Sequence, residues 1–222
     1  RGLINILDSF ICCKKKDLNF IEIIIGDDSP RKLISKEELI YYGKYIPNLK
    51  YLKNNRKGFI NNWNNLINIS KGKYYWLLCH DEVLNNANDS LTKILGALER
   101  GKSLLILPII KVYKYKISKR IKIDFFIKHT FNKLFLTFFI QNNIFILFLN
   151  VIGPPSAMIV DKNIKIRYRK DLKWLVDVDY YFKLFEYINN DNYIEFLSQQ
   201  NASVSSNQNF NNSLTKLLKK NK

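Results

Sequence analysis

Short apolar runs alternate with stretches of helical periodicity along the first half of the chain, and this alternation constrains the fold more than any other feature. Residues 2–13 carry apolar side chains at helical spacing, which predicts an amphipathic helix. Strands are expected at 20–25, 49–52, 74–78 and 103–110, with helices beginning at Ser35 and spanning 59–70 and 89–100. Strands separated by helices indicate a parallel sheet with right-handed crossovers, and therefore an α/β fold.

Two of these strands run directly into carboxylates. Asp27 and Asp28 follow the first strand, and Asp81 and Glu82 follow the strand at 74–78. Because ligands bind in the crevice at the carboxyl ends of parallel strands, we expect these acids to face one site. Mg²⁺ and Mn²⁺ prefer carboxylate oxygens and share them with substrate phosphates, so Asp81 and Glu82 are candidate metal ligands. The alternatives are a solvated turn for Asp81 and Glu82 and a turn cap for Asp27 and Asp28.

Composition limits the classes of partner. At 222 residues the chain can form one domain with an appendage, and its 47% apolar content excludes a disordered chain. The net charge of +17 favours anionic partners: nucleotide phosphates, an anionic membrane face or nucleic acid. Heavy use of Lys, Asn and Ile is an alternative, purely compositional origin of this charge. The sequence contains no recognised nucleic-acid-binding module, and its aromatic residues lie in apolar runs, so nucleic acid is not an expected partner.

The cysteines and histidines point to a reducing compartment without zinc. Cys12, Cys13 and Cys79 form no C-x-x-C pair, which is typical of cytoplasmic proteins. His80 and His129 are the two histidines, too few for a common zinc site. We therefore expect a cytoplasmic protein.

Three blocks of sequence follow one another in a familiar order. The first is E-I-I-I-G-D-D-S-P at 22–30, a strand that ends in a turn. The second is 55–84, in which Gly58 and Gly72 are fourteen residues apart and C-H-D-E follows the strand. The third joins G-P-P-S-A at 153–157 to W-L-V-D-V-D at 174–179. Together these blocks resemble the family 2 glycosyltransferases, whose nucleotide turn, D-x-D block and base-bearing region have this order and spacing.

The resemblance implies a fold, a reaction and a cofactor. The fold would be a three-layer GT-A sandwich with a mainly parallel central sheet. The reaction would move a sugar from a nucleotide-diphosphate donor to an acceptor hydroxyl, with inversion, in surface polysaccharide or glycan synthesis. Mg²⁺ or Mn²⁺ would stabilise the pyrophosphate leaving group, held by Asp81 at the last position of the D-x-D block with Glu82 beside it. Cys79 replaces the first Asp of that block.

The same resemblance implies a set of nucleotide contacts. Asp27 and Asp28 match the paired acids that accept hydrogen bonds from the base or ribose. Asn64 falls on the family's helix Asn, and Arg56 lies in the polar turn before that helix. Trp63 stands where the family usually has an Arg, which implies an altered phosphate contact.

Inverting transfer needs a general base that takes the proton of the acceptor hydroxyl. Asp177 matches the family's base, and Asp179 follows two residues later. If 176–186 is helical, the two side chains diverge by about 200°, so only one of them faces the site, and Asp177 is preferred. The alternative role of Asp177 is to satisfy free amides at a helix start.

The domain is expected to span 1–188, with an apolar helical insert at about 124–152 and a wrapping, frayed basic tail at 189–222. Three adjacent amides at 141–143 argue against a membrane span within the insert. A core hairpin and a hairpin lying on a membrane surface, flanked by the basic 111–122 segment, remain as alternatives. In the second case the protein would be peripheral on the inner face of the cell membrane, with a lipid-linked glycan as acceptor.

Three departures from the family favour other roles. The family has a first strand and an I-P-T-Y-N loop before its first helix, and Arg1 lies about where that loop would end. We therefore expect an N-terminally truncated sheet that lacks a central strand. Cys79 replaces an acid, and the tail lacks the late His of many relatives. A catalytically idle membrane-associated scaffold is the main alternative function, and a basic nucleic-acid-binding domain a weaker one.

Overall fold

The computed structural model describes residues 2–54, 58–80, 82–111, 142, 152–188, 193–197 and 204–206. Arg56, Asp81 and most of the expected insert at 124–152 lie outside these residues. The helices are α1 (Gly2–Ile11), α2 (Lys15–Leu18), α3 (Lys36–Gly43), α4 (Phe59–Ile69), α5 (Ala87–Leu98), the 3₁₀ turn η2 (Pro155–Ala157) and α7 (Val176–Ile188). The strands are β1 (Ile23–Asp27), β2 (Leu49–Lys53), β3 (Tyr74–Trp76), β4 (Glu82–Leu84), β5 (Leu104–Ile106), β6 (Ile109–Lys111), β7 (Met158–Asp161), β8 (Ile194–Phe196) and β9 (Val204–Ser206).

Among the described residues the strands form three groups. β1 pairs in parallel with β2, β3-β7-β5-β8 form a four-stranded sheet, and β4-β9-β6 form a three-stranded one. The α/β prediction is confirmed, but the sheets are mixed. β7 runs antiparallel to β3 and β5, and β9 runs antiparallel to β4, whereas the pairs β5–β8 and β6–β9 are parallel.

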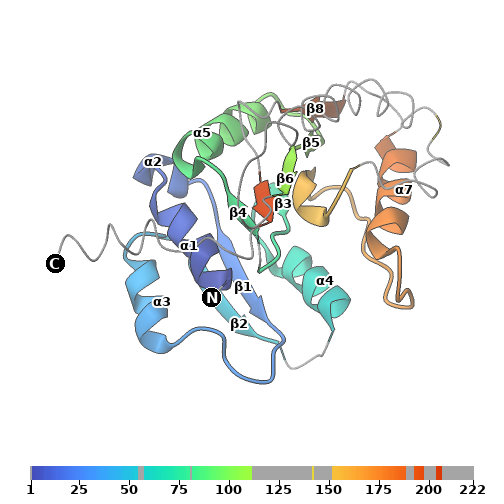
Figure 1. Ribbon diagram of the computed structural model, residues 1–222. Helices are drawn as coiled ribbons and strands as arrows, with labels where there is room; N and C mark the ends of the chain where they lie inside the picture. The colour runs from blue at the N-terminus through green and yellow to red at the C-terminus, as the bar shows by residue number, and fades with distance from the viewer. Residues whose placement is uncertain are drawn as a thin grey trace.

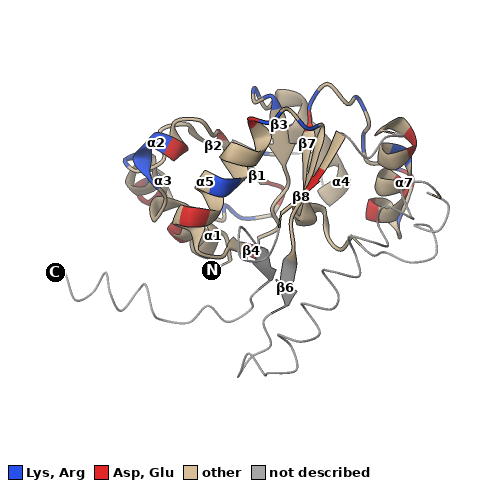
Figure 2. Ribbon diagram, turned by 90° about the horizontal axis from the view of Figure 1, so that it is seen from above, with Lys and Arg blue, Asp and Glu red and all other residues tan. Residues whose placement is uncertain are grey.

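Helices cover both faces of the central strands, so the molecule has three layers (Figures 1 and 2). Leu104 and Ile106 of β5 pack with α4 and α7, whereas Leu105 between them packs with α1 and α5. This alternation follows from the two-residue period of a strand, and it shows that β5 is buried on both faces. The three-layer sandwich predicted above is therefore confirmed.

Most element positions match the sequence-based expectations, and two differ for physical reasons. The capping box at Ser35 and Glu38 is present at the start of α3. β1 begins at Ile23, because Phe20 is 80% exposed and lies in the turn before the strand. The strand expected at 103–110 is split into β5 and β6 around Pro108, whose ring nitrogen has no hydrogen to donate to a ladder.

The two ends of the described chain contribute unequally to the sheets. β8 and β9 come from the segment expected to wrap the domain, and both add strands to the sheets. At the other end, α1 packs on β4 through the core that contains Ile6, Leu7 and Phe10. Within the described ranges, the helices are all too short or too polar to cross a bilayer.

α7 is firmly fixed on its face of the sheet. Tyr180, Tyr181, Leu184 and Phe185 are each at most 1% exposed, and burial of each large side chain stabilises the fold by about 1.5–3 kcal/mol. The amino end of α7 and the loop before it lie on the same side of the molecule as the carboxyl ends of β1 and β2 (Figure 1). Side chains near the start of α7 thus lie toward the same side of the molecule as these strand ends.

Candidate active site

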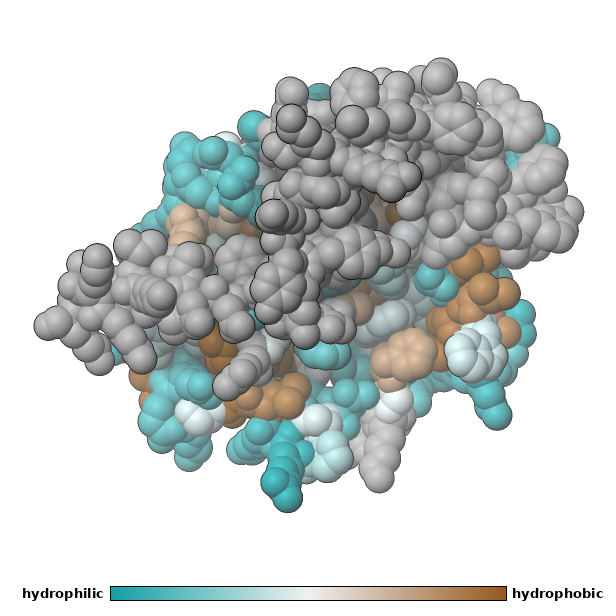
Figure 3. Space-filling model, in the orientation of Figure 1, coloured by the Kyte–Doolittle hydropathy of each residue, from teal (hydrophilic) through white to brown (hydrophobic). Residues whose placement is uncertain are grey.

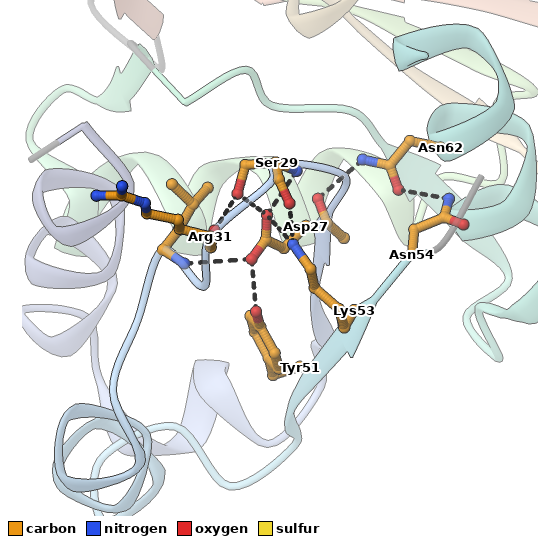
Figure 4. Close-up of polar contacts among 9 residues, drawn as sticks. Asp27, Ser29, Arg31, Tyr51, Lys53, Asn54 and Asn62 are labelled. Atoms are coloured by element: carbon orange, nitrogen blue, oxygen red, sulfur yellow. Dashed lines mark hydrogen bonds and ion pairs between the residues drawn. The ribbon is translucent and has the colours of Figure 1, made fainter. Parts of the chain in front are cut away.

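The turn after β1 is organised by Asp27, which is 1% exposed (Figure 4). Its Oδ1 accepts hydrogen bonds from the backbone N–H and hydroxyl of Ser29, the former at 2.9 Å. Its Oδ2 accepts from the Leu33 N–H at 3.2 Å and the Tyr51 hydroxyl at 2.5 Å, and Lys53 Nζ lies 3.4 Å from Oδ1. The carboxylate therefore shapes the loop that follows the strand.

The same contacts determine the ionisation of this pair. Burial alone would raise the pKa of Asp27, but hydrogen bonds from Ser29, Tyr51 and Leu33 outweigh it and hold the pKa far below its usual value. Burial, the bond to Asp27 and its negative charge raise the pKa of Tyr51 to about 12. Asp27 is thus a permanent anion and Tyr51 a permanent donor at physiological pH.

Asp28, the neighbouring acid, is placed differently. Its side chain is partly exposed and makes no hydrogen bond or ion pair within the described ranges. The sequence predicts nucleotide contacts for both acids. The contacts of Asp27 give it the turn-capping role, so Asp28 is the carboxylate of the two that is open to a ligand.

α4 is joined to the end of β1 by a side-chain amide. Asn62 Nδ2 donates to the Gly26 carbonyl at 2.8 Å, and Asn62 Oδ1 accepts from Asn54 at 3.3 Å (Figure 4). A Cβ added to Gly26 would lie 2.5 Å from Asn62 Oδ1 and 2.8 Å from Leu66. Glycine is therefore required here by the close approach of α4, which sets the position of the turn relative to that helix.

The turn after β3 is closed by Glu82, which is 3% exposed. Its Oε2 accepts the Cys79 N–H at 2.6 Å, and its Oε1 accepts the Ser156 hydroxyl at 2.5 Å. Both oxygens therefore accept hydrogen bonds inside the protein, and the assignment of Glu82 as a metal ligand stays a prediction. Glu82 fastens the turn at 79–82 to the segment at 153–157.

The segment at 153–157 is also held from two other elements. Trp76 Nε1 of β3 donates to the Ser156 carbonyl at 2.8 Å, and the Tyr181 hydroxyl of α7 donates to the Gly153 carbonyl at 2.9 Å. Gly153 has φ 105°, a conformation that favours glycine. This segment thus links the end of β3 to the helix that carries the candidate base.

The two acids at the start of α7 differ in their surroundings. Asp179 pairs with Lys183 at 2.8 Å and lies 3.7 Å from Arg169, and its side chain is 19% exposed. Asp177 is partly buried in the first helical turn, on another side of the helix. An acid in this turn is stabilised by the helix dipole. Two cations therefore already pair with Asp179, and Asp177 stays the candidate proton acceptor that the sequence predicts.

Two buried tyrosines, Tyr168 and Tyr181, have raised pKa values. Burial raises the pKa of Tyr181 well above its usual value, and the neighbouring Tyr168, Asp177, Glu82 and Cys79 add to this effect. Burial likewise raises the pKa of Tyr168, with contributions from Asp177 and Cys79. The end of β3 and the first turn of α7 therefore act on the same two hydroxyls, although about a hundred residues separate them in sequence.

Asn64 has a structural role in this protein, and its assignment to the nucleotide stays a prediction. Its Nδ2 donates to the Tyr168 carbonyl at 2.8 Å, and its Oδ1 accepts the Tyr168 N–H at 3.0 Å. The ring of Tyr168 is stacked on Tyr180 at 4.2 Å and lies against Trp63 at 5.1 Å. Asn64 therefore holds the loop between β7 and α7 in place, and Trp63 packs on it where the family usually has an Arg.

A model of glycosyl transferase family 2 matches residues 5–167, which is most of the chain. The chain belongs to glycosyl transferase family 2. The match includes the turns at 27–30 and 79–82 and the segment at 153–157, and it ends before Asp177. No curated protein matches the sequence significantly.

Solved structures of S. aureus TarS have the same fold as this family 2 chain. The structure of TarS 1–349 has a TM-score of 0.61 and 16% identity, and the match covers 93% of this chain and 56% of that one. TarS 1–349 in complex with UDP-GlcNAc gives a TM-score of 0.59 at 15% identity, with 93% and 55% covered. The chain thus spans about half the length of these structures.

The described residues do not form a metal site. Within the ranges given above, no group of three or more His, Cys, Asp and Glu side chains could hold a metal ion. Glu82 has both oxygens engaged by donors, and a sulfur ligand such as Cys79 suits Mg²⁺ or Mn²⁺ poorly. Asp81, the other candidate metal ligand, lies outside the described residues.

Three positioning residues were missed by the sequence analysis. Ser156 lies in a block that was recognised, but its bond to Glu82 joins residues 74 positions apart. Tyr181 follows Asp177 by four residues, and this spacing places two side chains on one helix face. The sequence therefore contained a signal that Tyr181 lies near Asp177. Tyr51 is one of several tyrosines in the sequence, and nothing distinguished it as the partner of Asp27.

Proposed function

We propose that this chain transfers a sugar from a nucleoside diphosphate donor to a hydroxyl of a glycan or lipid-linked glycan, in the synthesis of a surface polysaccharide or glycan. One observation carries the proposal. The turn after β3, the segment at 153–157 and the first turn of α7 are joined around Tyr168 and Tyr181. These contacts support a site that lies between the end of β3 and the candidate base.

The proposed chemical step is a single displacement with inversion. The acceptor oxygen attacks the anomeric carbon while the bond from that carbon to the diphosphate oxygen breaks. Asp177 takes the hydroxyl proton, and the diphosphate leaves with the electron pair. Support comes from the partial burial of Asp177 and from the ion pairs that occupy Asp179.

On the donor side we propose Asp28 for the base or ribose and Arg56 for the diphosphate. Asp28 is the open carboxylate after β1, and its turn is held rigid by Asp27. Solved structures of TarS contain UDP and UDP-GlcNAc, which makes a uridine diphosphate sugar the first donor to test. Mg²⁺ or Mn²⁺, held by Asp81, would offset the charge of the departing diphosphate.

Calorimetry with a panel of nucleoside diphosphates, with and without Mn²⁺, tests the proposal. We expect one nucleoside diphosphate to bind at least tenfold more tightly than the others, and Asp28→Asn to weaken it while Asp171→Asn, an exposed acid before α7, does not. Absence of binding to every nucleoside diphosphate, together with tight salt-sensitive binding to DNA or RNA, would overturn the proposal.

A catalytically idle scaffold of the same fold is the second candidate. It is favoured by Cys79 at the first position of the D-x-D block and by the internal use of both Glu82 oxygens. In that case a nucleoside diphosphate would bind, but neither transfer nor donor hydrolysis would follow with any sugar in the panel. Product analysis after incubation with labelled donors separates the two functions.

A further inference from the structure

The loop between β7 and α7 combines exposed apolar side chains with a strong positive charge. Residues 162–175 contain six Lys and Arg and one acid, and Figure 2 shows blue segments along this loop. Lys165, Lys170 and Lys173 are exposed and form no ion pair with other described residues. The single acid, Asp171, is paired with Arg169. The loop therefore presents uncompensated positive charge.

Trp174 and Leu175 project into solvent at the end of this loop. Trp174 is 84% exposed and Leu175 is 64% exposed, whereas Val176 after them is buried. Leu175 has φ 54°, a left-handed conformation that is costly for a side chain other than Gly. The hydrogen bonds of Asn64 to Tyr168 fix the middle of the loop and the buried α7 fixes its end, so packing imposes this conformation.

Apolar side chains gather nearby on the same face. Figure 3 shows brown, hydrophobic residues over the amino-terminal half of α7. Exposure of a large Trp–Leu pair to water costs free energy, and nothing in a soluble monomer offsets this cost. An occupant that covers this pair must accept apolar groups and carry negative charge close to them.

We propose that the loop at 165–175 docks on an anionic lipid bilayer, with Trp174 and Leu175 entering the headgroup region and Lys165, Lys170 and Lys173 contacting lipid phosphates. Tryptophan favours the interface between headgroups and acyl chains, leucine favours the acyl region, and lysines beside them bind anionic headgroups. A soluble anionic glycan could pair with the lysines and stack on Trp174, but it has no apolar group that would cover Leu175. The paired exposure of both side chains therefore favours a bilayer.

Docking through this loop has a consequence for the reaction. Asp177 lies in the helical turn that begins directly after Leu175. A bilayer at the loop would therefore place the candidate base beside the headgroups, within reach of an acceptor hydroxyl carried on a membrane lipid. This consequence rests on the proposed function, whereas the docking itself does not.

Co-sedimentation of the full chain with vesicles tests the docking, in the absence of donor. Vesicles of phosphatidylcholine alone are compared with vesicles that contain about one-third phosphatidylglycerol. We expect binding to the anionic vesicles only, weakened at least tenfold by Trp174→Ala with Leu175→Ala and about tenfold by Lys170→Gln with Lys173→Gln. Tyr187→Ala, which removes a 63% exposed aromatic at the far end of α7, is the matched control and leaves binding unchanged.

Tryptophan fluorescence locates the contact. Trp63 is packed against Phe59 and Tyr168, and Trp76 is bonded to Ser156, so Trp174 is the tryptophan that can enter the lipid. Anionic vesicles should shift its emission to shorter wavelength, and lipids brominated on the acyl chains should quench it. Trp174→Phe should abolish both signals while keeping most of the binding.

Three results would overturn the docking. The first is vesicle binding that survives the double Trp174 and Leu175 variant, since another segment then makes the contact. The second is binding to a soluble polyanion such as heparin, with the same residue dependence and no vesicle binding. The third is no binding to either. A loss of nucleotide binding in calorimetry would contradict the proposed function and leave the docking intact.

Discussion

Replacement of Asn64 by alanine should destabilise the protein without changing its affinity for nucleotide. Asn64 is 6% exposed and makes two hydrogen bonds to the backbone of Tyr168, itself 3% exposed. Each bond contributes about 1 kcal/mol, and stranding the buried peptide groups of Tyr168 costs about 1–3 kcal/mol more. We therefore expect Asn64→Ala to lower the free energy of unfolding by about 3 kcal/mol.

Urea denaturation followed by circular dichroism measures this loss. With a slope of about 2–3 kcal/mol per molar urea, the midpoint should fall by about 1 M. Asn65→Ala is the matched control, because Asn65 is the next residue on α4 and is exposed, and it should change stability by less than about 0.5 kcal/mol. An unchanged midpoint for Asn64→Ala, combined with a lost nucleotide affinity, would refute the structural role and support the assignment of Asn64 to the nucleotide.

Three further predictions concern the turns of the site. The native pKa of Asp27 is lowered, so its contribution to stability is complete above the unfolded pKa of about 4 and is lost as the pH falls below that value. Asp27→Asn should therefore flatten the dependence of stability on pH in this acid range. Urea midpoints at successive pH values measure this dependence. Glu82→Gln should lower the free energy of unfolding by about 1–3 kcal/mol, because the Cys79 N–H or the Ser156 hydroxyl loses its acceptor oxygen. A changed Mn²⁺ affinity of the nucleotide complex at unchanged stability would contradict this prediction. Gly26→Val should destabilise the protein by at least about 2 kcal/mol through the clash with Asn62, and Asn62→Ala should relieve part of that loss in the double variant, as thermal unfolding would show.

Local signals explain why the order of elements was predictable. The capping box at Ser35 and Glu38 depends on residues three positions apart, and the helix at 2–11 on the spacing of its own apolar side chains. Such features are decided within one or two turns of chain. Strand ends were less predictable. Pro108 lies between β5 and β6 and divides the expected strand, and β1 begins three residues after the exposed Phe20.

The chemistry of the candidate site was predictable only in part. Comparison of motifs identified acids at 27–28, 81–82 and 177–179, but it could not tell which oxygens are already engaged. That depends on contacts between residues far apart in sequence: Glu82 with Ser156, and Asn64 with the backbone of Tyr168. These contacts form only when the layers pack, so they assign structural roles that the motif alone could not distinguish from ligand binding.

The mixed sheets have a similar origin. Alternation of strands and helices predicted parallel pairing, and β1 with β2 obeys it. β7, in contrast, pairs antiparallel with both β3 and β5. Periodicity identifies a strand, but its direction depends on which neighbours it meets across the sheet.

The central claim, that Asp177 is the proton acceptor beside the donor site, is tested most directly by the turnover of Asp177→Asn with the donor found by calorimetry. The claim predicts a loss of about 10²–10⁴-fold in transfer, with the dissociation constant of the nucleoside diphosphate unchanged within about twofold. Asp179→Asn, which removes an acid already paired with cations, should lose less than about tenfold. Turnover of Asp177→Asn within about tenfold of the wild-type chain would contradict the claim.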